Sequence, residues 1–389
     1  MSRRAADTLR EFRAPDEAGA ERRTWGVVRD AYLEREPVPR RTRARARLAL
    51  IPVLSMIAAG LVLSPAGATV GRLITKALGV RHAAPMLSSL PTTGRVLVSG
   101  PGGTWTAAPD GSIRHLGDWS QASWSPRGLY VAVASRNRLA AVDPHGNVRW
   151  AIARPDISDP RWFSPSGYRV AYLSGKTLRV IAGDGTEDHL LAGRVATVAP
   201  AWRPGYSFQL AYVSDRNHIV VRDGDTEQVI WNTPALRSRP RELLWSSDGR
   251  RLVVTTAHAV MTYSGDGKRH TTLHLPIAPA DDAALSPDGK LIALVLGARQ
   301  LVVVRAGSSH SRVRQLLAVA GLREVSWSPN GSWLLAGLPA ADQWVFVRAL
   351  GTARVAAVGR IAQQFSAGGS AKTFPHLEGW CCTTRGSAG

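Results

Sequence analysis

The chain has 389 residues, of which 44% are hydrophobic, and it carries a formal net charge of +20. That apolar fraction supports a large packed core and excludes a wholly disordered protein. The excess of Lys and Arg favours anionic partners, although a basic surface without a dedicated partner is the commoner situation.

Residues 1–47 are expected to form a basic cytoplasmic stub, with 13 Lys and Arg against 8 Asp and Glu. Within this stub Trp25, Val28 and Tyr32 follow a helical spacing, which predicts one amphipathic helix. Such a helix either binds a cytoplasmic partner, lies on the inner leaflet or serves as a spacer.

Residues 48–71 contain no charged side chain, and they are predicted to form a transmembrane signal-anchor helix because about 20 residues cross a bilayer. Five arginines crowd its N-terminal flank: Arg40, Arg41, Arg43, Arg45 and Arg47. The positive-inside rule then places the stub in the cytoplasm and the remainder outside. A signal peptide cleaved near Ala68 is the alternative. Residues 72–94 are expected to form a juxtamembrane helix and linker.

One short phrase, in which a large apolar residue precedes Ser-Pro or its equivalent and then a Gly turn, recurs along the chain. Its anchor residues are Trp124, Trp162, Trp202, Trp245, Leu285 and Trp327. Successive anchors are 38, 40, 43, 40 and 42 residues apart, a period typical of a four-stranded propeller blade. Short apolar runs and Gly turns follow each anchor, as in antiparallel hairpins. We therefore predict an all-β propeller over residues 95–382, with the anchors packed between blades, and a disordered tail at 383–389.

The two ends of the repeat region predict how the ring closes. Residues 96–98, 104–107 and 110–111 reproduce two strands and the turn of a blade that has no anchor of its own. The missing inner strand is expected near Trp380, so that both chain ends complete one blade and no sheet edge stays open. This predicts seven blades. Six blades, with residues 95–117 as an accessory hairpin, are the alternative.

The phrase Ser123-Trp124-Ser125-Pro126 and its recurrences resemble the TolB-like repeats, relatives of WD-repeat propellers, whose consensus contains Trp-Ser-Pro-Asp-Gly. The resemblance covers about residues 95–380 and implies a propeller. It implies no single activity, because that family includes scaffolds, peptide binders and domains attached to enzymes. The membrane anchor departs from periplasmic TolB proteins, and the layout resembles single-pass bacterial envelope proteins of the actinobacterial kind.

No local motif for catalysis is present, since the sequence contains neither Gly-x-Ser-x-Gly nor His-Glu-x-x-His. His270 and His274 share a strand face but have no carboxylate ligand nearby. Asp281 and Asp282 are expected in a solvated loop at the propeller rim, with binding of a cation or basic peptide as the alternative. Residues 223–227 are acidic but occupy a hairpin turn. We therefore expect no catalytic residue, no metal and no cofactor.

Residues 367–373 have only a faint likeness to a phosphate-binding loop, because the Gly before the Lys is missing. The two cysteines, Cys381 and Cys382, are adjacent. They predict a packed pair of small residues, a vicinal disulfide or pairing with another chain outside the cytoplasm.

The leading functional hypothesis is a membrane-anchored, extracytoplasmic and non-catalytic binding or scaffolding module. Its partner would be a protein or peptide on a propeller face, or an anionic envelope polymer, without specific binding of nucleic acid. The alternatives are a transmembrane sensor that signals through a helix at residues 16–36, and a propeller hydrolase or lyase. The last would place histidines and carboxylates together at one mouth of the channel, where blades bring distant residues together.

Overall fold

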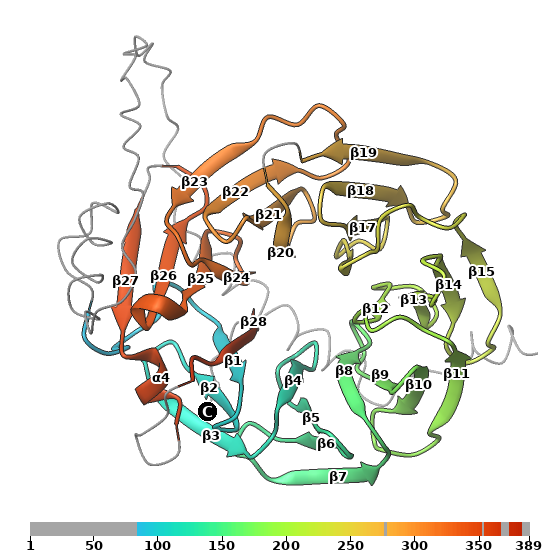
Figure 1. Cartoon of the computed structure of the whole chain (residues 1–389). Helices are drawn as coiled ribbons and strands as arrows, with labels where there is room; N and C mark the ends of the chain where they lie inside the picture. The colour runs from blue at the N-terminus through green and yellow to red at the C-terminus, as the bar shows by residue number, and fades with distance from the viewer. Residues whose placement is uncertain (1–83, 276–277, 352–353, 367–372, 383–389) are drawn as a thin grey trace, which may run out of the picture. The chain divides into compact units, whose positions relative to one another are not determined.

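The computed structural model describes residues 84–275, 278–351, 354–366 and 373–382. In these residues seven four-stranded antiparallel sheets form the blades of one ring (Figure 1). The prediction of an all-β propeller is confirmed, and the six-blade alternative is wrong.

The strands follow the predicted order, four to a blade, with the inner strand first in each blade. Blade 1 comprises β28 (His376–Cys381), β1 (Arg95–Ser99), β2 (Thr104–Ala107) and β3 (Ile113–Gly117). Blade 2 comprises β4 (Gln121–Trp124), β5 (Val131–Ser135), β6 (Arg138–Val142) and β7 (Val148–Ala153), and blade 3 comprises β8 (Ile157–Trp162), β9 (Arg169–Ser174), β10 (Thr177–Ala182) and β11 (His189–Gly193).

The other four blades are likewise continuous in the chain. Blade 4 comprises β12 (Ala201–Trp202), β13 (Gln209–Val213), β14 (Ile219–Asp223) and β15 (Val229–Asn232), and blade 5 comprises β16 (Glu242–Trp245), β17 (Arg251–Thr255), β18 (Ala259–Ser264) and β19 (His270–His274). Blade 6 comprises β20 (Ala280–Leu285), β21 (Leu291–Leu296), β22 (Gln300–Arg305) and β23 (Arg314–Ala318), and blade 7 comprises β24 (Arg323–Trp327), β25 (Trp333–Leu338), β26 (Gln343–Arg348) and β27 (Val355–Gly359).

The hydrophobic core lies between neighbouring blades. The second strand of blade 2, β5, reads Val-Ala-Val-Ala-Ser, and its four apolar residues are fully buried because blades cover both of its faces. The outer strand β7 instead alternates exposed and half-buried side chains, since only one face is covered. Continuous apolar runs therefore form strands in the middle of a blade, and alternating runs form its outermost strand.

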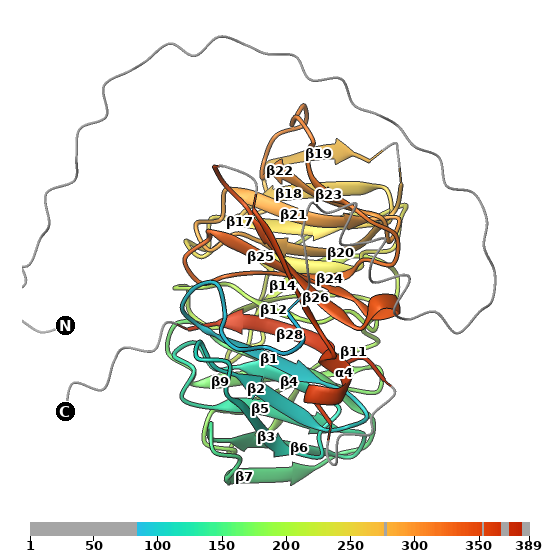
Figure 2. The same cartoon turned by 90° about the vertical axis from the view of Figure 1, so that its left-hand side faces the viewer.

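Blade 1 is composite, as the two ends of the repeat region predict. Val96 of β1 pairs with Trp380 of β28, and Arg95 pairs with Cys381 (Figures 1 and 2). The last described strand thus supplies the inner strand of the first blade. Pairing both chain ends in one sheet closes the ring without leaving a strand unpartnered in that blade.

Residues 84–94 lie against the ring rather than forming only a linker. Ala84 makes a parallel bridge with Val358 of β27, and Leu87 and Leu90 are buried. The segment therefore covers the boundary between blades 7 and 1.

Two short helical turns were not predicted: η1 (Pro339–Ala341) and α4 (Ile361–Gln364). Ile361 in α4 is fully buried, and the Gln364 side chain accepts a hydrogen bond from the Leu87 backbone N–H at 2.9 Å. A single turn of helix is too short to show a helical periodicity in the sequence.

The predicted stub, membrane helix and tail, at residues 1–47, 48–71 and 383–389, lie outside the described residues, as do the proposed sensor helix and most of residues 367–373. Within the described part, no helix is long and apolar enough to span a bilayer.

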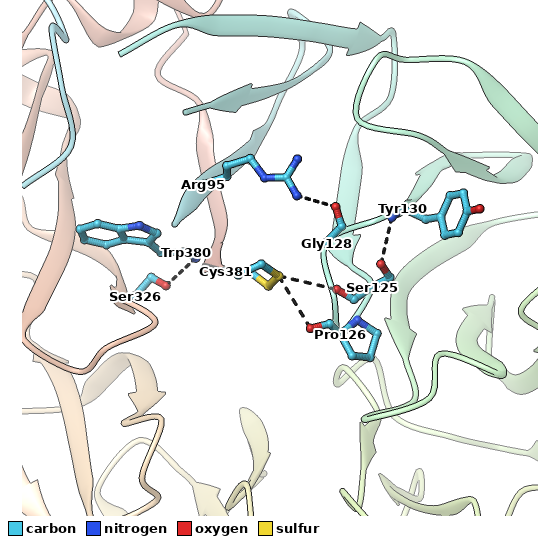
Figure 3. The surroundings of a disulfide bond; sticks show 9 residues. Arg95, Ser125, Pro126, Gly128, Tyr130, Ser326, Trp380 and Cys381 are labelled. Carbon is cyan, nitrogen blue, oxygen red and sulfur yellow. Dashed lines mark hydrogen bonds between the residues drawn. A yellow bond between two sulfur atoms is a disulfide. The ribbon is translucent and has the colours of Figure 1, made fainter. Parts of the chain in front are cut away.

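Cys381 and Cys382 form a vicinal disulfide at the end of β28 (Figure 3). The Cys382 sulfur lies 3.9 Å from the carbonyl oxygen of Ser125 and 3.8 Å from that of Pro126. Of the three predicted states, the disulfide is the one found, and it packs on the turn that follows the first anchor of blade 2.

Candidate functional site

The inner strands of the blades surround a central channel with a cavity of about 590 Å³. All seven predicted anchors contribute to its wall: Trp124, Trp162, Trp202, Trp245, Leu285, Trp327 and Trp380. Their recurrence in the sequence therefore marks one ring of structural positions.

Three anchor indoles bond to the preceding blade. Each donates a hydrogen bond to the carbonyl group that stands immediately before the anchor of that blade. The bonds are Trp202 Nε1 to Arg161 O at 2.9 Å, Trp245 Nε1 to Ala201 O at 3.1 Å and Trp327 Nε1 to Ala284 O at 2.9 Å. The anchors thus join blades by hydrogen bonds as well as by packing.

In a second set of bonds the side chains reach the other way around the ring, because side-chain oxygens accept hydrogen bonds from backbone N–H groups of the following blade. We call the five acceptor residues the acceptor belt: Gln121, Glu242, Asp282, Glu324 and Glu378. Each accepts one backbone N–H: Gln121 accepts that of Asp159 at 2.6 Å, Glu242 that of Ala283 at 3.2 Å, Asp282 that of Val325 at 2.6 Å, Glu324 that of Leu377 at 2.7 Å and Glu378 that of Ala122 at 3.3 Å.

The belt has a simple physical cause. An inner strand is the edge of its sheet, so every second N–H and C=O of that strand has no partner within the blade. Buried backbone groups need partners. The belt satisfies N–H groups on this edge, and the anchor indoles satisfy C=O groups.

Blades 3 and 4 contribute no acceptor to the belt, and the indole bonds replace it at blade 4. Ala199 stands at the belt position of this blade, just before β12, and its side chain has no acceptor atom; Pro200 next to it has no N–H to donate. The junctions on both sides of β12 instead carry the indole bonds of Trp202 and Trp245. Each of the seven blade junctions is thereby bridged by at least one of the two bond types.

Two belt carboxyls, Glu242 and Asp282, both line the wall of the channel. Burial raises the pKa of both groups, and the neighbouring Asp282 raises that of Glu242 further. Glu242 Oε2 is buried and has no donor among the described residues. The raised pKa values favour a proton on this pair, and a proton shared between the two carboxyls would satisfy this oxygen.

Two cationic groups accompany the belt. His376 Nδ1 lies 2.7 Å from Glu324 Oε1, and this hydrogen bond raises the pKa of the histidine. Arg161 lines the same cavity. Its charge opposes the effect of burial, which is the main cause of the raised pKa of Glu378. Glu242, Asp282 and Glu378 therefore do meet in the channel wall, but each of them already bonds a backbone N–H, and the His376 side chain is largely exposed.

The remaining sequence candidates have local structural roles. Asp282 lies on β20 in the channel, so the expectation of a solvated loop is wrong for it, whereas Asp281 is partly exposed and caps Ala298 N. Asp223 accepts bonds from the next turn, as predicted. His270 stacks on Tyr263, and no group of three metal-ligating side chains occurs within the described part of the chain.

The ring has two faces that differ in composition. The turn face carries the turns after the anchors, such as residues 125–130, and the connection face carries the loops between blades, such as residues 233–241. On the turn face three successive blades expose a tyrosine at about 40%, 66% and 37%: Tyr130, Tyr168 and Tyr206. Sequence reasoning missed these residues, although each follows an anchor phrase.

A cavity of about 590 Å³ opens between the first two of these tyrosines. Its wall includes Tyr130, Trp150, Tyr168 and the arginines Arg149 and Arg169. Trp150 Nε1 donates to Gly183 O at 2.8 Å, which fixes the indole across two blades. Both arginines form ion pairs, Arg149 with Asp143 at 2.9 Å and Arg169 with Asp225 at 2.9 Å. Three of these five wall side chains, Trp150, Arg149 and Arg169, are therefore held in place by polar contacts.

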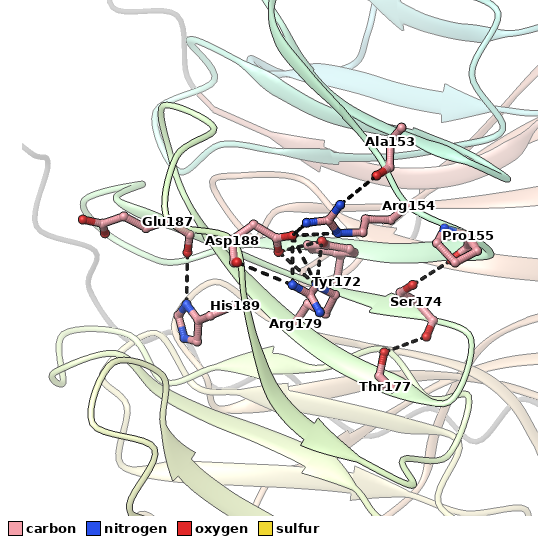
Figure 4. Close-up of polar contacts among 10 residues, drawn as sticks. All are labelled: Ala153, Arg154, Pro155, Tyr172, Ser174, Thr177, Arg179, Glu187, Asp188 and His189. Carbon is pink, nitrogen blue, oxygen red and sulfur yellow. Dashed lines mark hydrogen bonds and ion pairs between the residues drawn. The ribbon is translucent and has the colours of Figure 1, made fainter.

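An ion-paired network also joins blades 2 and 3 (Figure 4). The Asp188 carboxylate forms ion pairs with Arg154 of blade 2 at 2.7 Å and with Arg179 of blade 3 at 3.0 Å. The hydroxyl of the fully buried Tyr172 donates to the same carboxylate at 2.7 Å. Burial alone raises the pKa of Asp188, but these hydrogen bonds outweigh it and lower the pKa.

Comparison with known proteins supports the fold only. No family model matches the chain, and no curated protein matches it in sequence. A solved structure of the Myceliophteria thermophila Cps50 (Swd1) β-propeller domain aligns with a TM-score of 0.55 and 14% identity, over 66% of this chain and 98% of that chain. KlHsv2 with loop 6CD replaced by a Gly-Ser linker aligns with a TM-score of 0.53 and 14% identity, over 68% and 93%. The chain therefore has a WD40-like propeller fold.

Proposed function

We propose that the chain is a membrane-anchored, extracytoplasmic binding module that recognises a protein or peptide segment on the turn face of its propeller. One observation carries the proposal: the exposed aromatic cavity of Tyr130, Trp150 and Tyr168 on a ring whose blades are locked together. Aromatic and arginine side chains are the residues that contribute most to protein interfaces. Rigid support lowers the entropy cost of binding.

The bonding of the channel supports a non-catalytic role. Each belt carboxyl accepts a backbone N–H of the next blade, so the polar groups of the channel serve ring closure. The uncharged segment 48–71 with its arginine flank supports anchoring, and the likeness of the anchor phrases to TolB-like repeats agrees with an envelope location.

Photo-cross-linking in intact cells tests the binding face. A photoreactive amino acid at Tyr168 should yield a discrete protein adduct, whereas the same probe at Ile230, exposed on the outer strand β15, should not. Adducts of equal yield at both positions, or none at Tyr168, would contradict the proposal.

A protease experiment tests the topology. A tag placed after Gly389 should be cut by protease added to intact spheroplasts, and a tag before Met1 should be protected. The reverse pattern, or recovery of the whole chain in the soluble fraction, would contradict the anchor.

The carboxyl pair of Glu242 and Asp282 favours a second candidate, a hydrolase or lyase that uses the channel. Pairs of carboxyls with raised pKa values serve as general acids and bases in enzymes. Chromogenic ester, glycoside and phosphate substrates test it. A turnover rate that Glu242→Gln abolishes while the melting temperature is kept would support catalysis.

A further inference from the structure

The connection face carries a concentration of unpaired positive charge over blades 3 to 5. Four exposed arginines, the arginine cluster, occupy three neighbouring loops: Arg194, Arg216, Arg237 and Arg239. Among the residues that the structure describes, no carboxylate oxygen lies within 4.0 Å of their guanidinium groups. Asp215 is the one acidic residue in these loops.

Backbone hydrogen bonds hold the three loops together. Asp215 N donates to Arg194 O at 2.8 Å, and Leu236 N donates to Asn217 O at 3.0 Å. A cavity of about 410 Å³ opens beside them, lined by Arg239, Arg241, Thr197 and Ser238. Hydroxyl and guanidinium donors around one hollow suit anionic oxygen atoms.

The described chain begins on this same face. Gly359 N donates to Ala84 O at 2.8 Å, and Gly359 ends β27 where the loop to the next blade starts. Loops of the same kind, which connect one blade to the next, carry Arg194, Arg237 and Arg239. The chain therefore enters the ring from the side that bears the arginine cluster.

The connecting chain is short. Residues 72–83 separate Ala84 from the predicted membrane segment, and twelve residues span roughly 40 Å at full extension. A ring tethered this closely at one face cannot turn that face far from the bilayer.

We propose that the arginine cluster docks on anionic phospholipid headgroups of the membrane that the chain spans. This inference rests on the proposed membrane anchor. Arginines near an anionic surface bind it electrostatically, and their contributions add while the surface lies within a Debye length. Docking in this way points the turn face, with its aromatic cavity, away from the bilayer and towards soluble partners.

The test uses the full chain in lipid nanodiscs of two compositions, phosphatidylcholine alone and phosphatidylcholine with about 30% phosphatidylglycerol. Backbone hydrogen exchange is measured over residues 194–198, 214–218 and 234–241. We expect exchange in these loops to be slower by roughly tenfold in the anionic discs at low salt, and the difference to disappear at high salt.

Two variants with equal charge removal separate a specific face from general attraction. The variant R194Q/R216Q/R237Q/R239Q should lose the lipid-dependent slowing. The control R250Q/R269Q/R305Q/R312Q removes four exposed arginines of the turn face and should keep it.

The outcomes are distinct. Equal exchange rates in both discs, or an equal loss of the lipid-dependent slowing in both variants, overturns the lipid-docking surface and leaves the proposed anchor intact. Failure of the chain to enter discs overturns the anchor and the docking together. Slowing by added polyglutamate in neutral discs, without any effect of anionic lipid, would assign the cluster to an acidic polymer and overturn the proposal.

Discussion

The Asp282 carboxylate accepts a hydrogen bond from the backbone N–H of Val325 at 2.6 Å, across the boundary between blades 6 and 7. In the same junction the Trp327 indole donates to Ala284 O at 2.9 Å. Blade 6 thus accepts two hydrogen bonds from blade 7, one at a side chain and one at the backbone. The unpaired edge of each inner strand is satisfied from outside its own sheet.

Replacing Asp282 tests whether the belt stabilises the ring. Asp282→Ala leaves the Val325 N–H without a partner, and we expect a loss of about 1–3 kcal/mol in the free energy of unfolding. Asp282→Asn keeps an acceptor oxygen and should cost little. Urea unfolding measures both, and equal losses in the two variants would show that the hydrogen bond is unimportant.

The same pair predicts a dependence of stability on pH. Burial raises the pKa of Asp282 and Glu242 in the folded chain, so folding favours the protonated pair. Their contribution is complete below the unfolded pKa of about 4 and falls as pH rises through the folded values. As the pH rises from about 4 to 7, the melting temperature of the wild type should therefore fall relative to that of Asp282→Asn. A constant difference across that range would contradict the shared proton.

Two anchors allow a matched test of the indole bonds. Trp202 Nε1 donates to Arg161 O, whereas Trp162 Nε1 is buried and has no partner among the described residues. Trp202→Phe should lose about 1 kcal/mol more stability than Trp162→Phe, since both changes remove similar apolar area. Thermal unfolding of the two variants measures the difference, and the opposite order would be inconsistent with the bond.

The Asp188 network should stabilise the fold at neutral pH and lose this effect in acid. Its hydrogen bonds lower the carboxyl pKa, so its stabilising effect is present above the unfolded pKa of about 4 and is lost as pH falls further. Asp188→Asn should unfold more readily than the wild type at neutral pH, and the two should converge as the pH falls through the lowered pKa of the folded carboxyl. Persistent separation of their acid-unfolding curves would argue against the network.

Ring closure should depend on Trp380 and not on the adjacent disulfide. Trp380 is buried between blades and pairs with Val96, so Trp380→Ala should cost about 3–5 kcal/mol. The disulfide joins neighbouring residues and closes almost no chain, so the double change of Cys381 and Cys382 to Ser should cost far less. Denaturant midpoints of the two variants give the ranking.

Periodicity predicted the ring because each blade repeats the same packing problem. Trp124 and the five later anchors predicted six inner strands. The absence of an anchor before Val96 predicted the seventh inner strand at Trp380. Both predictions rest on local spacing, which a sequence shows directly.

The acceptor belt had a sequence signal that was missed. Gln121, Glu242, Asp282 and Glu324 each stand three residues before an anchor, so aligning the repeats on the anchors would have placed them in one ring. The turn-face cavity had no such signal, because it depends on which blades become neighbours.

The composite blade also constrains how the protein is made. Ser99 and Glu378 are hydrogen-bonded partners separated by 279 positions in the chain, so this contact forms only after almost the whole polypeptide has been synthesised. Blades 2 to 7 have all their strands earlier, yet the ring remains an open horseshoe until β28 arrives. If the propeller is exported as proposed, the final strand must cross the bilayer before closure. A premature stop codon only a few residues before Trp380 should then leave a long-lived, unclosed chain for proteases to remove.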